Sequence, residues 1–186
     1  MNETYKVQVQ GLVDDLKAVF THAGLGGEAG EYKLLTQSFL YKFLNDKFLY
    51  QAKILDESNT YENLLAMSEE DYDWLLEDIG TSTAWLKPDQ LIESLHRQQN
   101  EATFYETFEN TLNQIAIDNN DIFSVHTDGD TAIRLFDERL ITDTISDSSK
   151  RNEVAKAIIN LLARVKFDET IFSQGFDFFS TLFEYM

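Results

Sequence analysis

The sequence contains no cysteine, a single proline and eight glycines among its 186 residues. Without cysteine, the chain has neither disulfide bonds nor thiolate ligands for a zinc ion. Few prolines and glycines leave few obligatory backbone breaks, which favours helices over strands joined by tight turns. Long uncharged apolar runs are also missing, so the sequence predicts no membrane-spanning helix and no membrane partner. These absences predict a mainly α-helical protein.

The N-terminus lacks the basic region and the apolar run of a signal peptide. Together with the absence of cysteine, which fits a reducing compartment, this predicts a cytoplasmic protein. The composition is 43% hydrophobic and 13% aromatic, which is enough to build a substantial core. At this length we expect residues 1–186 to form a single helical domain.

Basic residues are scarce as well, since 15 Lys and Arg stand against 33 Asp and Glu, a formal net charge of -18. Such a surface repels a phosphate backbone over roughly 8 to 10 Å at physiological salt, which disfavours nucleic-acid binding over the whole surface. The charge is uneven, because residues 54–86 hold nine acids and no Lys or Arg. Residues 150–166 hold one acid and five basic residues: Lys150, Arg151, Lys156, Arg164 and Lys166.

This basic segment is the one that we expect to face a polyanion, if any face does. The alternative is a solvated helix face whose positive charges balance acidic neighbours.

Residues 31–50 form the most apolar stretch of the chain. At helical spacing they place two apolar stripes side by side, the first formed by Tyr32, Leu35, Phe39 and Phe43 and the second by Leu34, Leu40, Leu44 and Phe48. Because two stripes leave little surface for water, the pattern predicts a buried helix over about residues 31–54, with the rest of a helical bundle around it. The glycine-rich stretch 24–30 before it matches neither a phosphate-binding loop nor a dinucleotide-binding fingerprint.

Apolar periodicity predicts further helices, among them residues 5–22 and 148–166. Asn59 and Ser68 each precede an acid by three residues, which predicts that both cap short acidic helices. One stretch departs from helical spacing, because residues 122–135 place apolar residues on both sides of an Asp-Gly-Asp turn. This stretch predicts a small β-hairpin that rests on the helices.

The sequence shows no constellation of residues with catalytic chemistry. His22, His96 and His126 lie far apart in the sequence, and no nucleophile, metalloprotease or phosphate-loop motif occurs. The crowded carboxylates of residues 69–73 are typical of helix caps and solvated charge rather than of a cation site. We therefore predict no catalytic, cofactor-binding or metal-binding residue in this chain.

Two segments resemble the N-terminal helical domain of the DNA adenine methyltransferase (modification) subunit of type I restriction-modification systems. Glu31 and Tyr32 lead into the apolar helix LLTQSFLYKFLNDKF, which is similar to the family's acid-tyrosine entry and leucine-rich helix. The stretch FDFFSTLFEYM, residues 176–186, looks like the segment that precedes the catalytic domain in this family. The order and helical character of the intervening segments are compatible, so the resemblance covers nearly the whole chain.

The resemblance implies a parent enzyme that transfers a methyl group from S-adenosylmethionine to N6 of a flipped-out adenine. This chain departs from the full family, because one proline excludes an Asn-Pro-Pro motif and no glycine-rich cofactor loop is present. For this chain the resemblance implies a domain that packs on the methyltransferase core and assembles with the specificity and restriction subunits around DNA, with the basic helix toward the phosphates. We also expect the reading frame to continue past Met186 into the catalytic domain.

A second interpretation is a stand-alone acidic interaction protein, such as a DNA mimic, which occupies a nucleic-acid-binding partner. The net charge of -18 and the acid-only stretch 54–86 favour it. A third interpretation, a small hydrolase that uses clustered carboxylates, has no constellation of residues behind it. A stop codon directly after Met186 favours the second interpretation, and a continuing frame favours the first.

Overall fold

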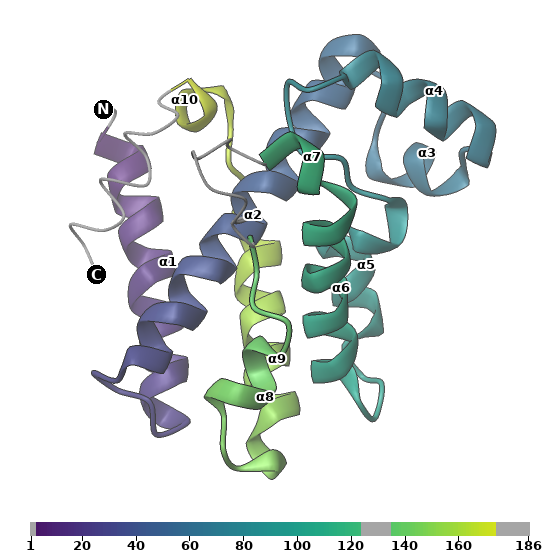
Figure 1. The fold of residues 1–186 in the computed structure, drawn as a ribbon. Helices are drawn as coiled ribbons and strands as arrows, with labels where there is room; N and C mark the ends of the chain where they lie inside the picture. Colours follow the sequence, from purple (N-terminus) through teal and green to yellow (C-terminus); the bar gives the residue numbers. More distant parts are fainter. Residues whose placement is uncertain (1–2, 124–134, 174–186) are drawn as a thin grey trace, which may run out of the picture.

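The computed structural model describes residues 3–123 and 135–173, and over these ranges the protein is mainly helical, as the sequence predicts (Figure 1). The elements in chain order are α1 (Glu3–His22), α2 (Ala29–Leu55), α3 (Tyr61–Ala66), α4 (Glu69–Ile79), the 3-10 turn η1 (Pro88–Gln90), α5 (Ile92–Gln98), α6 (Phe104–Asp118), α7 (Asn120–Phe123), α8 (Leu140–Thr144), α9 (Ser148–Arg164) and α10 (Glu169–Phe172).

Helix α2 confirms the buried helix predicted over about residues 31–54. It follows a loop in which Gly24 and Gly27 have φ values of 90° and 76°, a conformation that residues with a Cβ rarely adopt. The helix crosses the bundle diagonally (Figure 1) and packs against α1, α4, α8 and α9. Its large side chains Phe39, Tyr41 and Phe48 are fully buried. Apolar residues on several sides therefore place α2 in the core.

Helix α9 is equally central. It packs against α1, α5 and α6, with further contacts to α2 and α8 (Figure 1). Its inner residues Val154, Ile158 and Leu162 are buried, as helical periodicity predicts. The sequence indicated one inner face for this helix, but the fold places neighbours on several sides.

The caps confirm one predicted N-cap residue and correct the other. Ser68 caps α4, since its Oγ accepts the N–H of Asp71 at 3.2 Å and donates to the Asp71 carboxylate at 2.6 Å. The prediction for Asn59 was wrong, because Thr60 caps α3. The buried Asn59 side chain donates instead to the Ala52 carbonyl at 2.9 Å. The Ala52 carbonyl, in the last turn of α2, accepts this amide in addition to the backbone N–H of Asp56 at 3.2 Å.

The predicted hairpin is wrong at its start. Ile122 and Phe123 lie in the short helix α7, because the chain resumes helical geometry directly after the Asn119 break. Residues 124–134, the rest of that prediction, lie outside the described residues, as does the apolar segment 176–186. No strand occurs within residues 3–123 and 135–173.

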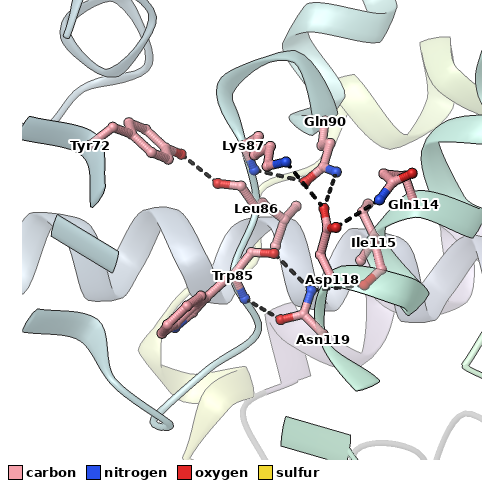
Figure 2. Close-up of polar contacts among 9 residues, drawn as sticks. All are labelled: Tyr72, Trp85, Leu86, Lys87, Gln90, Gln114, Ile115, Asp118 and Asn119. Atoms are coloured by element: carbon pink, nitrogen blue, oxygen red, sulfur yellow. Dashed lines mark hydrogen bonds and ion pairs between the residues drawn. The ribbon is translucent and has the colours of Figure 1, made fainter. Parts of the chain in front are cut away.

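A polar network fixes the segment between α4 and α5 onto the end of α6 (Figure 2). The N–H of Trp85 donates to Asn119 Oδ1 at 2.6 Å, and Asn119 Nδ2 donates back to the Trp85 carbonyl at 2.8 Å. Gln90 Nε2 donates to Asp118 at 2.9 Å. Asn119 and Gln90 are buried, so these bonds satisfy polar groups that lie away from water. The network therefore holds the segment between α4 and α5 in place against α6.

Candidate functional site

The predicted basic residue Arg151 serves the fold. Its Nε donates to the Ile145 carbonyl at 2.9 Å and its Nη2 to the Thr142 carbonyl at 3.4 Å, at the C-terminal end of α8. The guanidinium also lies over the Tyr105 ring, 5.8 Å from the centroid. At the other end of α8, the buried Glu109 of α6 accepts two backbone N–H groups at 3.1 and 3.0 Å. Since helix ends lack intrahelical partners, these two side chains hold α8 in place.

The other basic residues of α9 form a strip rather than a compact patch. At 3.6 residues per turn, Lys150, Lys156 and Arg164 fall within about 120° of the helix circumference, apart from the buried arc. Lys150 and Arg164 are separated by about 21 Å along the axis at 1.5 Å per residue. Arg164 and Lys166 are exposed, whereas Lys150 and Lys156 are half-buried. We call Lys150, Lys156 and Arg164 the basic strip.

Two further polar residues of α9, which the sequence did not single out, bind neighbouring helices. Asn152 Oδ1 accepts the N–H of Tyr105 at 3.0 Å, in the first turn of α6. Asn160 Nδ2 donates to Gln99 Oε1 at 2.6 Å, and its Oδ1 lies 3.0 Å from His96 Nε2. These partners lie 47 to 64 residues away in the sequence, so no local pattern could have found them.

A cleft of about 690 Å³ opens at the C-terminal end of α9. Its walls come from the second half of α2, the start of α3, the start of α5 and the segment between α9 and α10. Of the five predicted basic residues, only Lys166 lines it. Residues 42–61, 91–96 and 163–169, three parts of the chain that are distant in the sequence, thus meet around one hollow.

A buried ion pair forms the inner wall of the cleft. Lys42 Nζ lies 2.9 Å from Asp46 Oδ2, and the two side chains are only 5% and 7% exposed. Asp46 also accepts the N–H of Phe167 at 2.8 Å and Asn45 Nδ2 at 2.8 Å. Burial lowers the pKa of Lys42, against the opposing effect of Asp46. Asp46 therefore joins α2 to the segment that follows α9.

The neighbouring Asn45 joins α2 to α5. Its Oδ1 accepts the N–H of Ile92 at 2.9 Å, the first residue of α5, whose N-cap Leu91 offers no side-chain bond. The sequence patterns did not single out Lys42 and Asp46 as a pair. Their spacing of four residues inside an otherwise apolar helix was the available signal for a buried pair.

The acid-only stretch forms an acidic face on α4, with Glu69, Glu70, Asp73 and Glu77 around Trp74. The Trp74 side chain is 61% exposed. The second tryptophan, Trp85, is bound within the fold, because its Nε1–H donates to the Gly80 carbonyl at 2.7 Å. Within the part of the chain that the structure describes, none of these four carboxylates forms an ion pair. Helices α3 and α4 extend outward from the rest of the bundle (Figure 1).

No family model, curated protein or solved structure matches the chain. Among the described residues, no group of His, Asp or Glu side chains is arranged to hold a metal ion. None of the helices in the described ranges combines the length and the apolar character needed to cross a membrane. Among the described residues, the surfaces with a distinct chemical character include the cleft, the basic strip of α9 and the acidic face of α4.

Proposed function

We propose that the chain is the N-terminal helical domain of an adenine-specific DNA methyltransferase subunit of a type I restriction-modification system, acting in the cytoplasm. The observation that carries this proposal is the resemblance of residues 31–48, from Glu31 and Tyr32 through LLTQSFLYKFLNDKF, to this family. These residues belong to α2, whose contacts with four other helices suit a scaffold. The domain itself contributes assembly with the specificity and restriction subunits, and the methyl transfer from S-adenosylmethionine belongs to the catalytic part of the subunit.

In this proposal the basic strip of α9 engages DNA phosphates within the assembled complex. Arg151 contributes little to this contact, because its guanidinium is bound to the carbonyls of α8. Each phosphate that a basic side chain neutralises releases counterions and steepens the salt dependence of binding. The strip is narrow, so we expect it to add a few phosphate contacts to those of the other subunits.

The DNA role is tested by reversing two charges, Lys156→Glu with Arg164→Glu, in the assembled complex. Affinity for DNA falls, and the slope of log K against log salt becomes flatter by roughly one to two. The matched control, Lys6→Glu with Lys17→Glu, makes the same charge change on α1. An unchanged slope in the Lys156 and Arg164 variant contradicts the DNA role.

The family proposal itself is tested in the gene. We expect the frame to continue beyond codon 186 into a glycine-rich stretch, a Thr-Pro pair and an Asn-Pro-Pro-aromatic motif. Co-purification of the longer product with a specificity subunit checks assembly. A stop codon at position 187 contradicts the proposal.

The acidic face of α4 favours a second candidate function, an acidic interaction protein such as a DNA mimic. Four carboxylates that pair with no cation of the described residues, placed around an exposed tryptophan, suit contact with a basic partner surface. In that case the chain by itself displaces duplex DNA from a DNA-binding partner, and Glu69→Gln with Asp73→Gln weakens the displacement. The methyltransferase proposal expects no such displacement.

A further inference from the structure

We propose that the cleft at the C-terminal end of α9 binds a small molecule that carries a single anionic group on an aromatic or apolar body. This proposal goes beyond the DNA role and does not depend on it, because none of the residues of the basic strip lines the cleft. The cleft volume of about 690 Å³ lies within the range of small-molecule sites, roughly 300 to 1,000 Å³.

The walls of the cleft suit an uncharged, flat body. Leu49 and Val165 supply apolar surface, and Tyr50 and Tyr61 supply aromatic rings. Tyr61 is already held in place. Its hydroxyl lies 2.8 Å from Ser94 Oγ of α5, and the Arg97 guanidinium lies 4.8 Å from its ring centroid. A ring that is fixed before the ligand arrives loses little conformational entropy on binding.

The carboxylates of the cleft are largely occupied. Asp46 accepts from three donors, as described above. Glu93 accepts a hydrogen bond from Arg97, one turn further along α5, at 3.0 Å. Asp168 accepts the backbone N–H of Thr170, in the first turn of α10, at 3.0 Å. Glu169 lies beside the hydroxyl of Tyr50. Each of the four carboxylates of the cleft thus has a partner within the fold.

Within the described residues, each lysine of the cleft pairs with at most one carboxylate. The Lys42 ammonium has three N–H donors and pairs with one carboxylate, that of Asp46. Lys53 and Lys166 are exposed, and neither pairs with a carboxylate within residues 3–123 and 135–173. An anionic group between these lysines gains charge-assisted hydrogen bonds, and near the buried Lys42 it is less screened by salt.

The net charge of the chain limits the ligand to a small charge. With a net charge of -18, the protein repels polyanions at long range. For a multiply charged ligand, this repulsion offsets the attraction of the cleft lysines. A ligand with a single anionic group on an apolar body gains affinity both from the cleft lysines and from the apolar and aromatic walls.

The test uses the 186-residue chain and two dyes that differ in one group. They are 8-anilino-1-naphthalenesulfonate and N-phenyl-1-naphthylamine, which lacks the sulfonate. We expect saturable binding of the sulfonate dye at a single site, weakened about tenfold by Lys53→Gln with Lys166→Gln, as for the loss of one charge-assisted hydrogen bond. Affinity for the neutral dye stays within about twofold. The matched control, Lys6→Gln with Lys17→Gln, removes the same charge from α1 and leaves the affinity for both dyes unchanged.

A second variant tests the hollow itself. Ala163 is exposed on the wall of the cleft, so Ala163→Trp fills the cleft without disturbing the core. Both dyes then bind more weakly, while the melting temperature stays near that of the wild type. The proposal is overturned if the sulfonate dye binds without saturation, if both lysine pairs weaken it equally, or if Ala163→Trp leaves its binding intact. No DNA is present, so the result is independent of the DNA role.

Discussion

Helices α2 and α9 both lie in the centre of the bundle, but they are held there by different means. Helix α2 is apolar around most of its circumference, and Phe39, Tyr41 and Phe48 are fully buried. Helix α9 is amphipathic, and its polar residues Asn152 and Asn160 are bonded to α6 and α5. A helix thus becomes central either through apolar residues on several sides or through polar residues that each receive a partner. In the second case, burial of the helix depends on hydrogen-bond partners that the neighbouring helices supply.

The same distinction operates within α2 itself. Lys42, Asn45 and Asp46 are buried polar residues of an otherwise apolar helix, and each has a partner. Their bonds hold α5 and the segment after α9, and so shape the cleft. Apolar packing buries α2, whereas these three polar residues hold α5 and the segment after α9 beside it.

The largest effect is expected from the apolar side of the comparison. Phe39→Ala lowers the free energy of unfolding by about 3 to 5 kcal/mol, because the fully buried ring leaves a cavity. Ile54→Ala, on the same helix but 59% exposed, changes it by no more than about 0.5 kcal/mol. Urea denaturation of both variants measures the difference. Similar values for the two would contradict the central place of α2.

A smaller effect is expected from the polar side. Asn160→Ala removes the bonds to Gln99 and His96 and lowers the free energy of unfolding by about 1 to 3 kcal/mol. Glu153→Ala, on an exposed position of α9, serves as the control and costs no more than about 0.5 kcal/mol. A double-mutant cycle with Gln99→Ala isolates the pair. A coupling energy near zero would mean that the bond between Asn160 and Gln99 does not help to hold α9.

The smallest effect concerns the N-terminal ends of the two helices. Hydrogen bonds from the Ser149 hydroxyl and backbone N–H lower the pKa of Asp147, the N-cap of α9, whereas the α2 N-cap Glu28 makes no side-chain capping bond. Because the folded state favours the Asp147 carboxylate, its stabilisation is present above the unfolded pKa of about 3.9 and is lost as the pH falls through the lower folded pKa.

Melting curves from about pH 6 down to about pH 2.5 measure this effect. Asp147→Asn lowers the melting temperature slightly at the upper end, and the difference from the wild type shrinks toward the lower end. Glu28→Gln, at the N-cap of α2, is the matched control, because Glu28 makes no side-chain capping bond. A constant difference for Asp147→Asn across this range would mean that the charge of Asp147 does not matter to α9.

Much of the helical fold could be predicted because the signals are local. The apolar stripes of α2 and α9 repeat at helical spacing, and Ser68 with Asp71 forms a cap within three residues. The choice between Asn59 and Thr60 could not be predicted, because the Ala52 carbonyl that occupies Asn59 is brought near only when the chain turns back on α2.

Little of the candidate site could be predicted. Lys166 was singled out for its charge, but the cleft that it lines requires Asp46 and Phe167, 121 residues apart in the sequence, to meet. Arg151 was singled out for the same reason, yet its charge is directed to the carbonyls of α8. Charge in a sequence therefore does not distinguish a side chain that faces solvent from one that caps a neighbouring helix.

The sequence by itself determined the helical class, the burial of α2 and the uneven charge, because periodicity, composition and local capping act within a few turns of chain. Only the tertiary structure decided which polar residues are occupied and which remain available. Asn160 and Arg151 are bound to neighbouring helices, whereas Lys53 and Lys166 line a cleft and pair with no carboxylate of the described residues. The physical reason is that a polar group on a helix surface takes the partner that folding brings to it, and that partner comes from a distant part of the chain.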